Sequence, residues 1–213
     1  MNLRGSIPVD ANLAWQELPG KLQWVDLPLS GLKLLRPRVH ADHRGNFMES
    51  WNRESFRQAG IECEFVQDNQ SLSVCPGTLR GLHFQAPPHA QAKLVRCLQG
   101  KVFDVAVDMR KGSPTFGQWL GVELSRENHL QLFLPEGFLH GFATIEPHSV
   151  VFYKCSALYA PEHERAVRFD DPELGIDWGM AQNAIVISER DSQAPFWREL
   201  DSPFVFEALR EQP

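Results

Sequence analysis

The stretch from residue 64 to residue 158 is a series of short apolar runs that are separated by turn-forming residues. The runs are rich in Val, Leu, Phe and Thr, and Gly, Pro, Asn or Asp stands in the gaps. They occupy residues 64–74, 78–85, 93–100, 101–110, 116–124, 131–137, 140–146 and 149–158. Many short strands at regular spacing are typical of a sandwich or a barrel. We therefore predict an all-β fold, whose interior the 14 phenylalanines help to fill.

The residues before this stretch predict an extension, a hairpin and one helix. Residues 1–30 have weak periodicity and are expected to form an N-terminal extension, which includes a strand that packs on a partner subunit. Residues 32–50 indicate strand, turn and strand around Arg44. Residues 52–59 give the best helix start in the chain, because Asn52 can cap a helix there.

The residues after this stretch, 162–213, are punctuated by Pro and Asp. We expect them to wrap the barrel as loops with short helices. The predicted organisation is an N-terminal extension (1–30), a barrel domain (31–195) and a C-terminal tail (196–213).

Composition argues against several classes of partner. The net charge of −6 and the lack of any basic run argue against nucleic-acid binding. No apolar run approaches the ~20 residues that a membrane span needs, and the N-terminus lacks the apolar core of a secretory signal. The four cysteines have no C-x-x-C spacing, so we expect buried, reduced thiols and neither a zinc site nor disulfides. A cytoplasmic protein is the resulting expectation.

Two motifs resemble the paired motifs of the cupin superfamily, which fold as a double-sheet jelly roll. The first is GLHFQ, starting at Gly81, and the second is PEGFLH, ending at His140. Metal-binding cupins carry H-x-H and then a glutamate in the first motif. Here the second histidine is replaced by Gln85, and Lys93 stands where the glutamate is expected. Two histidines beside an ammonium make a poor metal cage, so we predict no metal at this barrel mouth.

Without a metal, His83 is free to act as a base. A lone histidine in a barrel is more often structural, but other polar side chains lie on the same two predicted strands. These are Arg80, Gln85, Lys93 and Arg96. Inward-facing polar groups are costly in a dry core. A ligand cavity explains them better than a packed interior does.

Longer segments resemble the dTDP-4-dehydrorhamnose 3,5-epimerase family over about residues 32–195. They are DHRGNFMESWN, FVQDNQS, LRGLHFQ, AQAKLVRCLQGKVFDVAVDMRKGSPTFGQW, LSRENHLQLFLPEGFLHGF, VFYK, LYAPEHE and DDPELGIDW. The resemblance implies a cupin-type double-stranded β-helix (jelly roll) with short peripheral helices. It also implies a homodimer that acts on a nucleotide-sugar substrate and needs no cofactor.

The resemblance assigns roles to individual residues. His83 matches the general base and Asp191 the carboxylate that orients it, while Tyr153 matches the acid on the opposite face of the sugar. Lys93 matches the ammonium near the C4 carbonyl. The substrate-binding matches are Arg44, Glu49, Gln67, Asn69, Arg80, His140, Tyr159, Glu164 and Arg190, of which Tyr159 would stack on the base. The chain departs from the common pattern at Asn46, Gln70, Ala92 and Leu158, none of which is a catalytic match.

These residues suit chemistry at a 4-keto sugar. The C–H bonds at C3 and C5 flank a carbonyl, so a base with a pKa near neutrality, such as imidazole, can form an enolate. The implied reaction converts dTDP-4-dehydro-6-deoxy-D-glucose to dTDP-4-dehydro-L-rhamnose. Two alternatives remain open: a mono-epimerase on a related nucleotide-linked 4-keto sugar, and a sugar-binding cupin without catalysis or with a metal.

Overall fold

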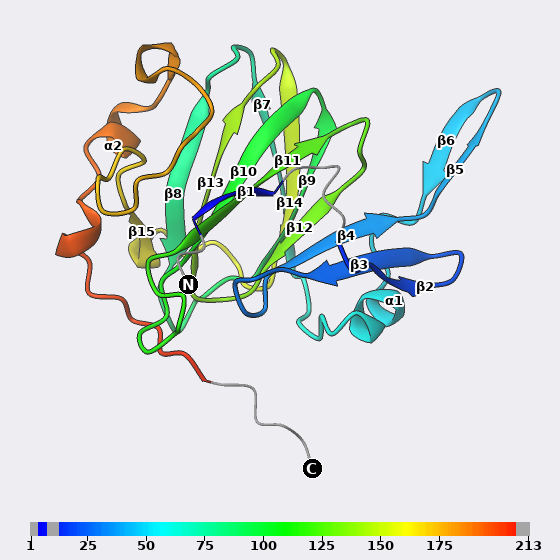
Figure 1. Ribbon diagram of the computed structural model, residues 1–213, viewed down its shortest axis with the longest axis horizontal. Helices are drawn as coiled ribbons and strands as arrows, with labels where there is room; N and C mark the ends of the chain where they lie inside the picture. Colours follow the sequence, from blue (N-terminus) through cyan, green and yellow to red (C-terminus); the bar gives the residue numbers. More distant parts are fainter. Residues whose placement is uncertain (1–3, 8–12, 208–213) are drawn as a thin grey trace.

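A computed structural model describes residues 4–7 and 13–207 of the chain, and β-strands dominate it (Figure 1). The strands are β1 (Gly5–Ile7), β2 (Gln16–Leu18), β3 (Leu22–Asp26), β4 (Lys33–Pro37), β5 (Val39–Asp42), β6 (Gly45–Met48), β7 (Gln67–Ser73), β8 (Leu79–Gln85), β9 (Lys93–Gln99), β10 (Lys101–Asp108), β11 (Trp119–Ser125), β12 (Gln131–Leu134), β13 (Phe138–Thr144), β14 (Ser149–Cys155) and β15 (Glu164–Ala166). The helices are α1 (Arg53–Gln58) and α2 (Glu189–Ser192), with 3-10 turns η1 (Pro161–His163), η2 (Gln182–Ala184) and η3 (Trp197–Glu199). Every apolar run that the sequence pattern singled out overlaps one strand.

Two sheets face each other and form the barrel. Sheet A has the order β1-β11-β10-β13-β8-β15, and sheet B has the order β2-β3-β4-β12-β9-β14-β7. The pairings are antiparallel apart from that of β1 with β11. Strands that are adjacent in a sheet are seldom consecutive in the chain, which is the arrangement of a jelly roll. The prediction of an all-β cupin fold is therefore confirmed.

The core lies between the two sheets. One cluster joins side chains from both, among them Val95 of β9, Val102 of β10 and Leu132 of β12, each fully shielded from solvent. In β10, Val102 and every residue from Asp104 to Asp108 are buried, as expected for a strand covered on both faces. A second cluster, between sheet A and the C-terminal segment, covers the outer face of β10.

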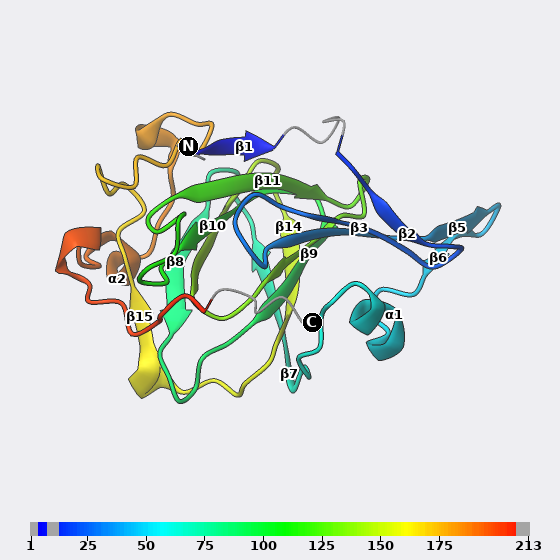
Figure 2. The ribbon, with the colours of Figure 1, turned by 60° about the horizontal axis from the view of Figure 1, so that its bottom comes forward.

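The described part of the N-terminal segment is tied to the barrel. Strand β1 runs parallel to β11 at the edge of sheet A, as Figure 2 shows, and β3 pairs with β4 in sheet B. Leu27 and Leu29 are buried in the core. Residues 22–29 thus belong to the same packed unit as the strands that follow. The division at residue 30 stays a prediction, and residues 1–3 and 8–12 lie outside the described part.

Strands β5 and β6 form a hairpin that projects away from the barrel (Figure 1). The hairpin turns at Arg44, as predicted, and Gly45 follows with a φ of 132°. Helix α1 comes next and is capped as expected, because the side chain of Asn52 accepts bonds from the backbone of Glu54 and Ser55. The helix packs its buried Phe56 on the outer face of sheet B.

The C-terminal segment wraps sheet A with loops and short helices, as predicted, and adds the short strand β15. Phe169, Leu174 and Trp178 are buried against that sheet. The tail up to residue 207 also packs on the barrel, where the hydroxyl of Ser202 donates to the carbonyl of Met109. Within the described ranges, no helix is long and apolar enough to cross a bilayer.

All four cysteines are free thiols, and one of them differs from expectation. Cys97 and Cys155 are buried and Cys63 is half-buried, but Cys75 is exposed. It lies in the turn between β7 and β8, where its carbonyl accepts from the hydroxyls of Thr78 and Thr144. The prediction that every thiol is buried is wrong here, because a turn residue has no second sheet to cover it.

Candidate active site

A cavity of about 480 Å³ opens between the two sheets along β8, from Leu79 to His83. It adjoins a second hollow of about 300 Å³, and the two share the side chains of His83, Lys93, Tyr153 and Glu164. The larger part is also lined by Ser71, Thr78, Arg80, His140, Ser188 and Asp191, and the smaller part by Gln67, Asn69, Gln85, Gln91 and Tyr159. Most of the residues that sequence analysis selected therefore meet at one place.

His83 is held in this cavity by an unusual stretch of β8. The preceding Gly81 has a φ of 128°, and a Cβ there would lie 2.5 Å from the Cα of Gly141 on β13. Only glycine permits this close approach. The approach brings β8 against β13, with His83 directly opposite His140. The glycine of the GLHFQ motif is thus needed to place the imidazole.

Asp191 lies in α2, which packs beside β8 (Figure 1). Its Oδ1 is 2.8 Å from Nε2 of His83, while its Oδ2 accepts from the backbone N–H of Gly81 at 3.4 Å. Burial alone would raise the pKa of Asp191, but the hydrogen bond and charge of His83 and the bond from Gly81 lower it below its ordinary value. The carboxylate is therefore ionised and can hold one tautomer of His83.

Lys93 and Tyr153 face His83 from sheet B. They are diagonal neighbours on β9 and β14, and Nζ of Lys93 lies 5.9 Å from the centre of the Tyr153 ring. Burial lowers the pKa of Lys93, although the nearby Cys155, Asp104 and Glu164 oppose that shift. Burial raises the pKa of Tyr153, so its phenol stays protonated at neutral pH.

His140 has its own carboxylate partner, which the sequence analysis missed. Its Nε2 lies 3.0 Å from both oxygens of Asp104, which is fully buried on the neighbouring strand β10. A polar residue in the middle of an otherwise apolar, two-face-buried strand is the signal that could have revealed Asp104.

The smaller part of the cavity is built around Glu164 and Tyr159. The Tyr159 hydroxyl donates to Glu164 at 2.9 Å, and the Arg190 guanidinium contacts the same carboxylate oxygen at 2.5 Å. Burial alone would raise the pKa of Glu164, but its bonds from Arg190 and Tyr159 lower it. The Tyr159 backbone N–H donates to Gln67, whose amide in turn donates to Asn69. The Tyr159 ring stays 53% exposed and is free to receive a flat group.

Two of the selected residues, Arg44 and Glu49, lie outside this cavity within one chain, and a third, Arg190, does not line it but contacts the lining residue Glu164. Arg44 is on the projecting hairpin, 78% exposed, and pairs with Asp42 at 2.6 Å. Glu49 follows the hairpin and accepts bonds from Asn52 and Ser55 of the α1 cap. A partner subunit would be needed for either residue to contact a ligand in the cavity.

Arg96 does not line the cavity, so the prediction that it points inward with the other polar residues is wrong. This residue is on the other face of β9 from Lys93, over the ring of Phe152 at 5.9 Å. The period of two in a strand separates positions 93 and 96 onto opposite faces.

Ser71 was missed, although it lines the cavity beside Gln67 and Asn69 at the same period of two along β7. Its buried hydroxyl has no hydrogen-bond partner among the described residues.

Gln85 has a structural task. It is buried, and its side chain joins three backbone groups: the carbonyls of His89 and Leu158 and the N–H of Ala160. It thus fixes the loop after β8 to the loop after β14. A metal would fit the cavity poorly, because the Lys93 ammonium, a cation that cannot be a ligand while protonated, lines the cavity together with His83 and His140.

Comparisons with known proteins identify the family of the chain. The family model described as dTDP-4-dehydrorhamnose 3,5-epimerase matches residues 26–199. A relative of that name from Sinorhizobium fredii is 47% identical over 87% of this chain and 95% of its own, and one from Pseudomonas aeruginosa is 49% identical over 82% and 96%. The crystal structure of a dTDP-6-deoxy-D-glucose-3,5-epimerase from Legionella pneumophila, in complex with dTDP-4-keto-L-rhamnose, has a TM-score of 0.83 at 41% identity, covering 88% of this chain and all of that one. The chain thus belongs to the dTDP-4-dehydrorhamnose 3,5-epimerase family.

Proposed function

We propose that this protein epimerises dTDP-4-dehydro-6-deoxy-D-glucose at C3 and C5 and releases dTDP-4-dehydro-L-rhamnose. One observation carries the proposal beyond family membership. His83 and Tyr153 project into one cavity from opposite sheets of the barrel, His83 from sheet A and Tyr153 from sheet B. Inversion at carbon requires that a proton leaves one face and another arrives on the opposite face, and this arrangement provides both.

His83 removes the proton. The bond between its Nε2 and Asp191 leaves the lone pair on Nδ1, which is the nitrogen that accepts the proton from C3 or C5. The ionised carboxylate then stabilises the imidazolium, because the two charges are opposite and Asp191 is shielded from water. General base catalysis of this kind contributes about 10²–10⁴-fold.

Lys93 stabilises the enolate. Negative charge develops on the C4 oxygen as the proton leaves, and the ammonium is the cation that lines both parts of the cavity. Burial lowers its pKa, which makes it a better hydrogen-bond donor to the developing oxyanion. Such stabilisation is strongest where water is excluded.

Tyr153 completes the inversion. Its raised pKa keeps the phenol proton in place until an enolate, which is more basic than water, accepts it from the face opposite His83. The nucleotide end of the substrate lies toward Tyr159, whose exposed ring supplies a stacking face. Arg190, which contacts Glu164, and Arg80, which lines the larger part of the cavity, supply guanidinium groups for the diphosphate.

A homodimer would explain the position of Arg44 and Glu49. The hairpin β5–β6 projects into solvent with Arg44 and the 72%-exposed Phe47 on it, so in one chain neither side chain supports the barrel. Sheet B ends in the uncovered edge strand β7, where Leu72 is 54% exposed. We place the hairpin of one subunit at the cavity of its partner, and the protein in the cytoplasm, where its four free thiols stay reduced.

The reaction is tested by incubating the dTDP-linked 4-keto sugar with the enzyme in D₂O and following C3 and C5 by NMR. Deuterium at both carbons, with L-rhamno product, is expected. Exchange at only one carbon would instead make the protein a mono-epimerase, and no exchange would make it a binding protein for this substrate.

Mixed dimers test the position of the hairpin. Arg44→Ala and His83→Ala subunits are each expected to be weak alone. If Arg44 serves the partner's cavity, a heterodimer of the two has one intact site, and a random mixture recovers about a quarter of wild-type activity. If Arg44 acts within its own chain, or if light scattering finds a monomer, mixing restores nothing.

A further inference from the structure

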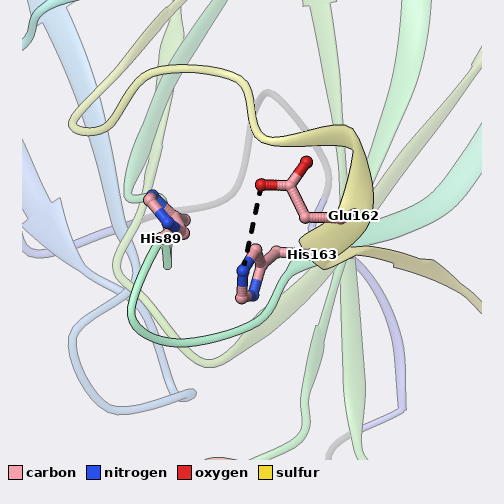
Figure 3. A group of neighbouring side chains, drawn as sticks. All are labelled: His89, Glu162 and His163. Carbon is pink, nitrogen blue, oxygen red and sulfur yellow. Dashed lines mark ion pairs between the residues drawn. The ribbon is translucent and has the colours of Figure 1, made fainter.

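Outside the cavity, a second group of polar side chains gathers where the loop after β8 meets η1. Figure 3 shows the three: His89 from the loop, and Glu162 and His163 from η1. One ligand atom from each, an imidazole nitrogen or a carboxylate oxygen, lies within 4.8 Å of the other two. The two imidazole rings are 4.6 Å apart between centres, and Nε2 of His163 is 4.0 Å from the Glu162 carboxylate.

The donor set is one that zinc and related ions prefer. Two imidazoles and one carboxylate occur together in many zinc sites, with bonds of about 2.0–2.2 Å. Ligand atoms around a tetrahedral ion are then about 3.3 Å apart. The three atoms here lie within 4.8 Å of one another, so rotations of these exposed or half-buried side chains can bring them to that spacing. Because Glu162 is exposed, water can supply the fourth ligand.

The backbone on both sides of the group is already fixed. The N–H of His89 donates to the carbonyl of Ala86, and the N–H of Ala86 donates to the carbonyl of His163. The buried amide of Gln85 holds the His89 carbonyl as well. Both segments are tied to the same end of β8, so the loop is already ordered before an ion binds. Binding therefore avoids the large entropic cost of ordering a flexible loop.

We propose that His89, Glu162 and His163 bind one divalent transition-metal ion of the zinc type. None of the three lines either part of the active-site cavity. The ion is therefore structural: it cross-links the loop after β8 to the segment 159–164, which carries Tyr159 and Glu164. Sequence motifs for zinc do not reveal it, because His89 and His163 come from distant parts of the chain.

Binding is tested on tag-free, chelator-treated protein by titration with Co²⁺ and with Zn²⁺. One Co²⁺ per chain is expected, with the visible absorption of a four- or five-coordinate ion that Zn²⁺ displaces. At about 100 times the dissociation constant, the ion should raise the melting temperature by about 5–10 °C. His89→Ala and His163→Ala should each weaken binding more than tenfold, and Glu162→Gln somewhat less.

The matched control is His148→Asn, because His148 is an exposed histidine elsewhere on the surface and asparagine tolerates its positive φ of 54°. This variant should bind the metal like the wild type. The proposal is wrong if the wild type binds no tighter than the double variant His89→Ala/His163→Ala, or if the Co²⁺ spectrum persists in that double variant.

Discussion

The protein contains two histidine–aspartate pairs that lie side by side, and they are built in opposite ways. His83 and His140 are opposite each other on β8 and β13, yet the side chain of His83 is 25% exposed while that of His140 is 7% exposed. Asp191 comes from a short helix in the C-terminal segment, whereas Asp104 is on the strand next to His140. One pair opens to the cavity and the other is part of the wall.

This difference suits the His83–Asp191 pair to catalysis and the His140–Asp104 pair to a structural role. A base must exchange protons with substrate, so it needs access, and its partner must be held without filling the cavity. Asp191 on α2 meets this need, since Ser188 caps its helix and Gly81 fixes its second oxygen. The Asp104 pair has both oxygens on one imidazole nitrogen and none left for a ligand. It stabilises the sheet and presents the rest of the His140 ring to the cavity.

The largest expected effect comes from removing each histidine. His83→Ala should lower deuterium exchange at C3 and C5 by at least about 10³-fold with a smaller change in stability, because the half-buried imidazole and Asp191 both line the cavity, where water can take the place of the ring. His140→Ala should do the reverse and lower the free energy of unfolding by about 3–5 kcal/mol, because it leaves the buried Asp104 without a partner. Exchange kinetics and urea denaturation measure the two effects.

A conservative variant checks this comparison. His140→Gln keeps a donor for Asp104 and should recover most of the lost stability. If His140→Ala instead abolishes exchange while staying as stable as the wild type, His140 takes part in the chemistry and the division between the two pairs fails.

The next effect concerns the carboxylates. Asp191→Asn keeps the shape of the side chain but replaces the carboxylate with an amide. His83 then loses the group that fixes its tautomer and the negative charge that stabilises its imidazolium. We expect kcat to fall about 10²-fold with KM little changed, measured by a coupled reductase assay. Asp104→Asn should lower kcat less than tenfold, and an equal loss in both variants would contradict the separate roles.

Much of this arrangement could be predicted from the sequence, but unevenly. The strands and the cavity positions of His83 and Lys93 follow from alternation and from the motifs, because a strand fixes where each side chain points. Asp191 followed only from family resemblance, since in isolation SERDSQAP is an ordinary polar loop. Its place beside β8 depends on how the C-terminal segment packs on sheet A, which no local pattern encodes.

For Asp104 and Gln85, the sequence shows the polar residue but not its hydrogen-bond partner. Both were visible as polar residues in apolar runs, yet their partners are a side chain on the next strand and backbone groups of two loops. Hydrogen-bond partners that are distant in sequence appear only once the sheet order is known. The same reason hides any contact that Arg44 makes across a dimer, because one chain's sequence does not state which surface meets its copy.

The smallest expected effect is in the pH dependence of stability. The pKa of Asp191 is lowered from its ordinary 3.8, so this carboxylate stabilises the folded state above pH ~4, and the contribution is lost as pH falls through 3.8 toward the folded-state pKa. Asp191→Asn has no such group. Wild type should therefore unfold at a higher urea concentration than Asp191→Asn at pH 6, and the difference should shrink below pH 4. A constant difference from pH 6 to pH 3 would mean that Asp191 supports the fold through packing and its bond to Gly81, and that its charge is used only to orient His83.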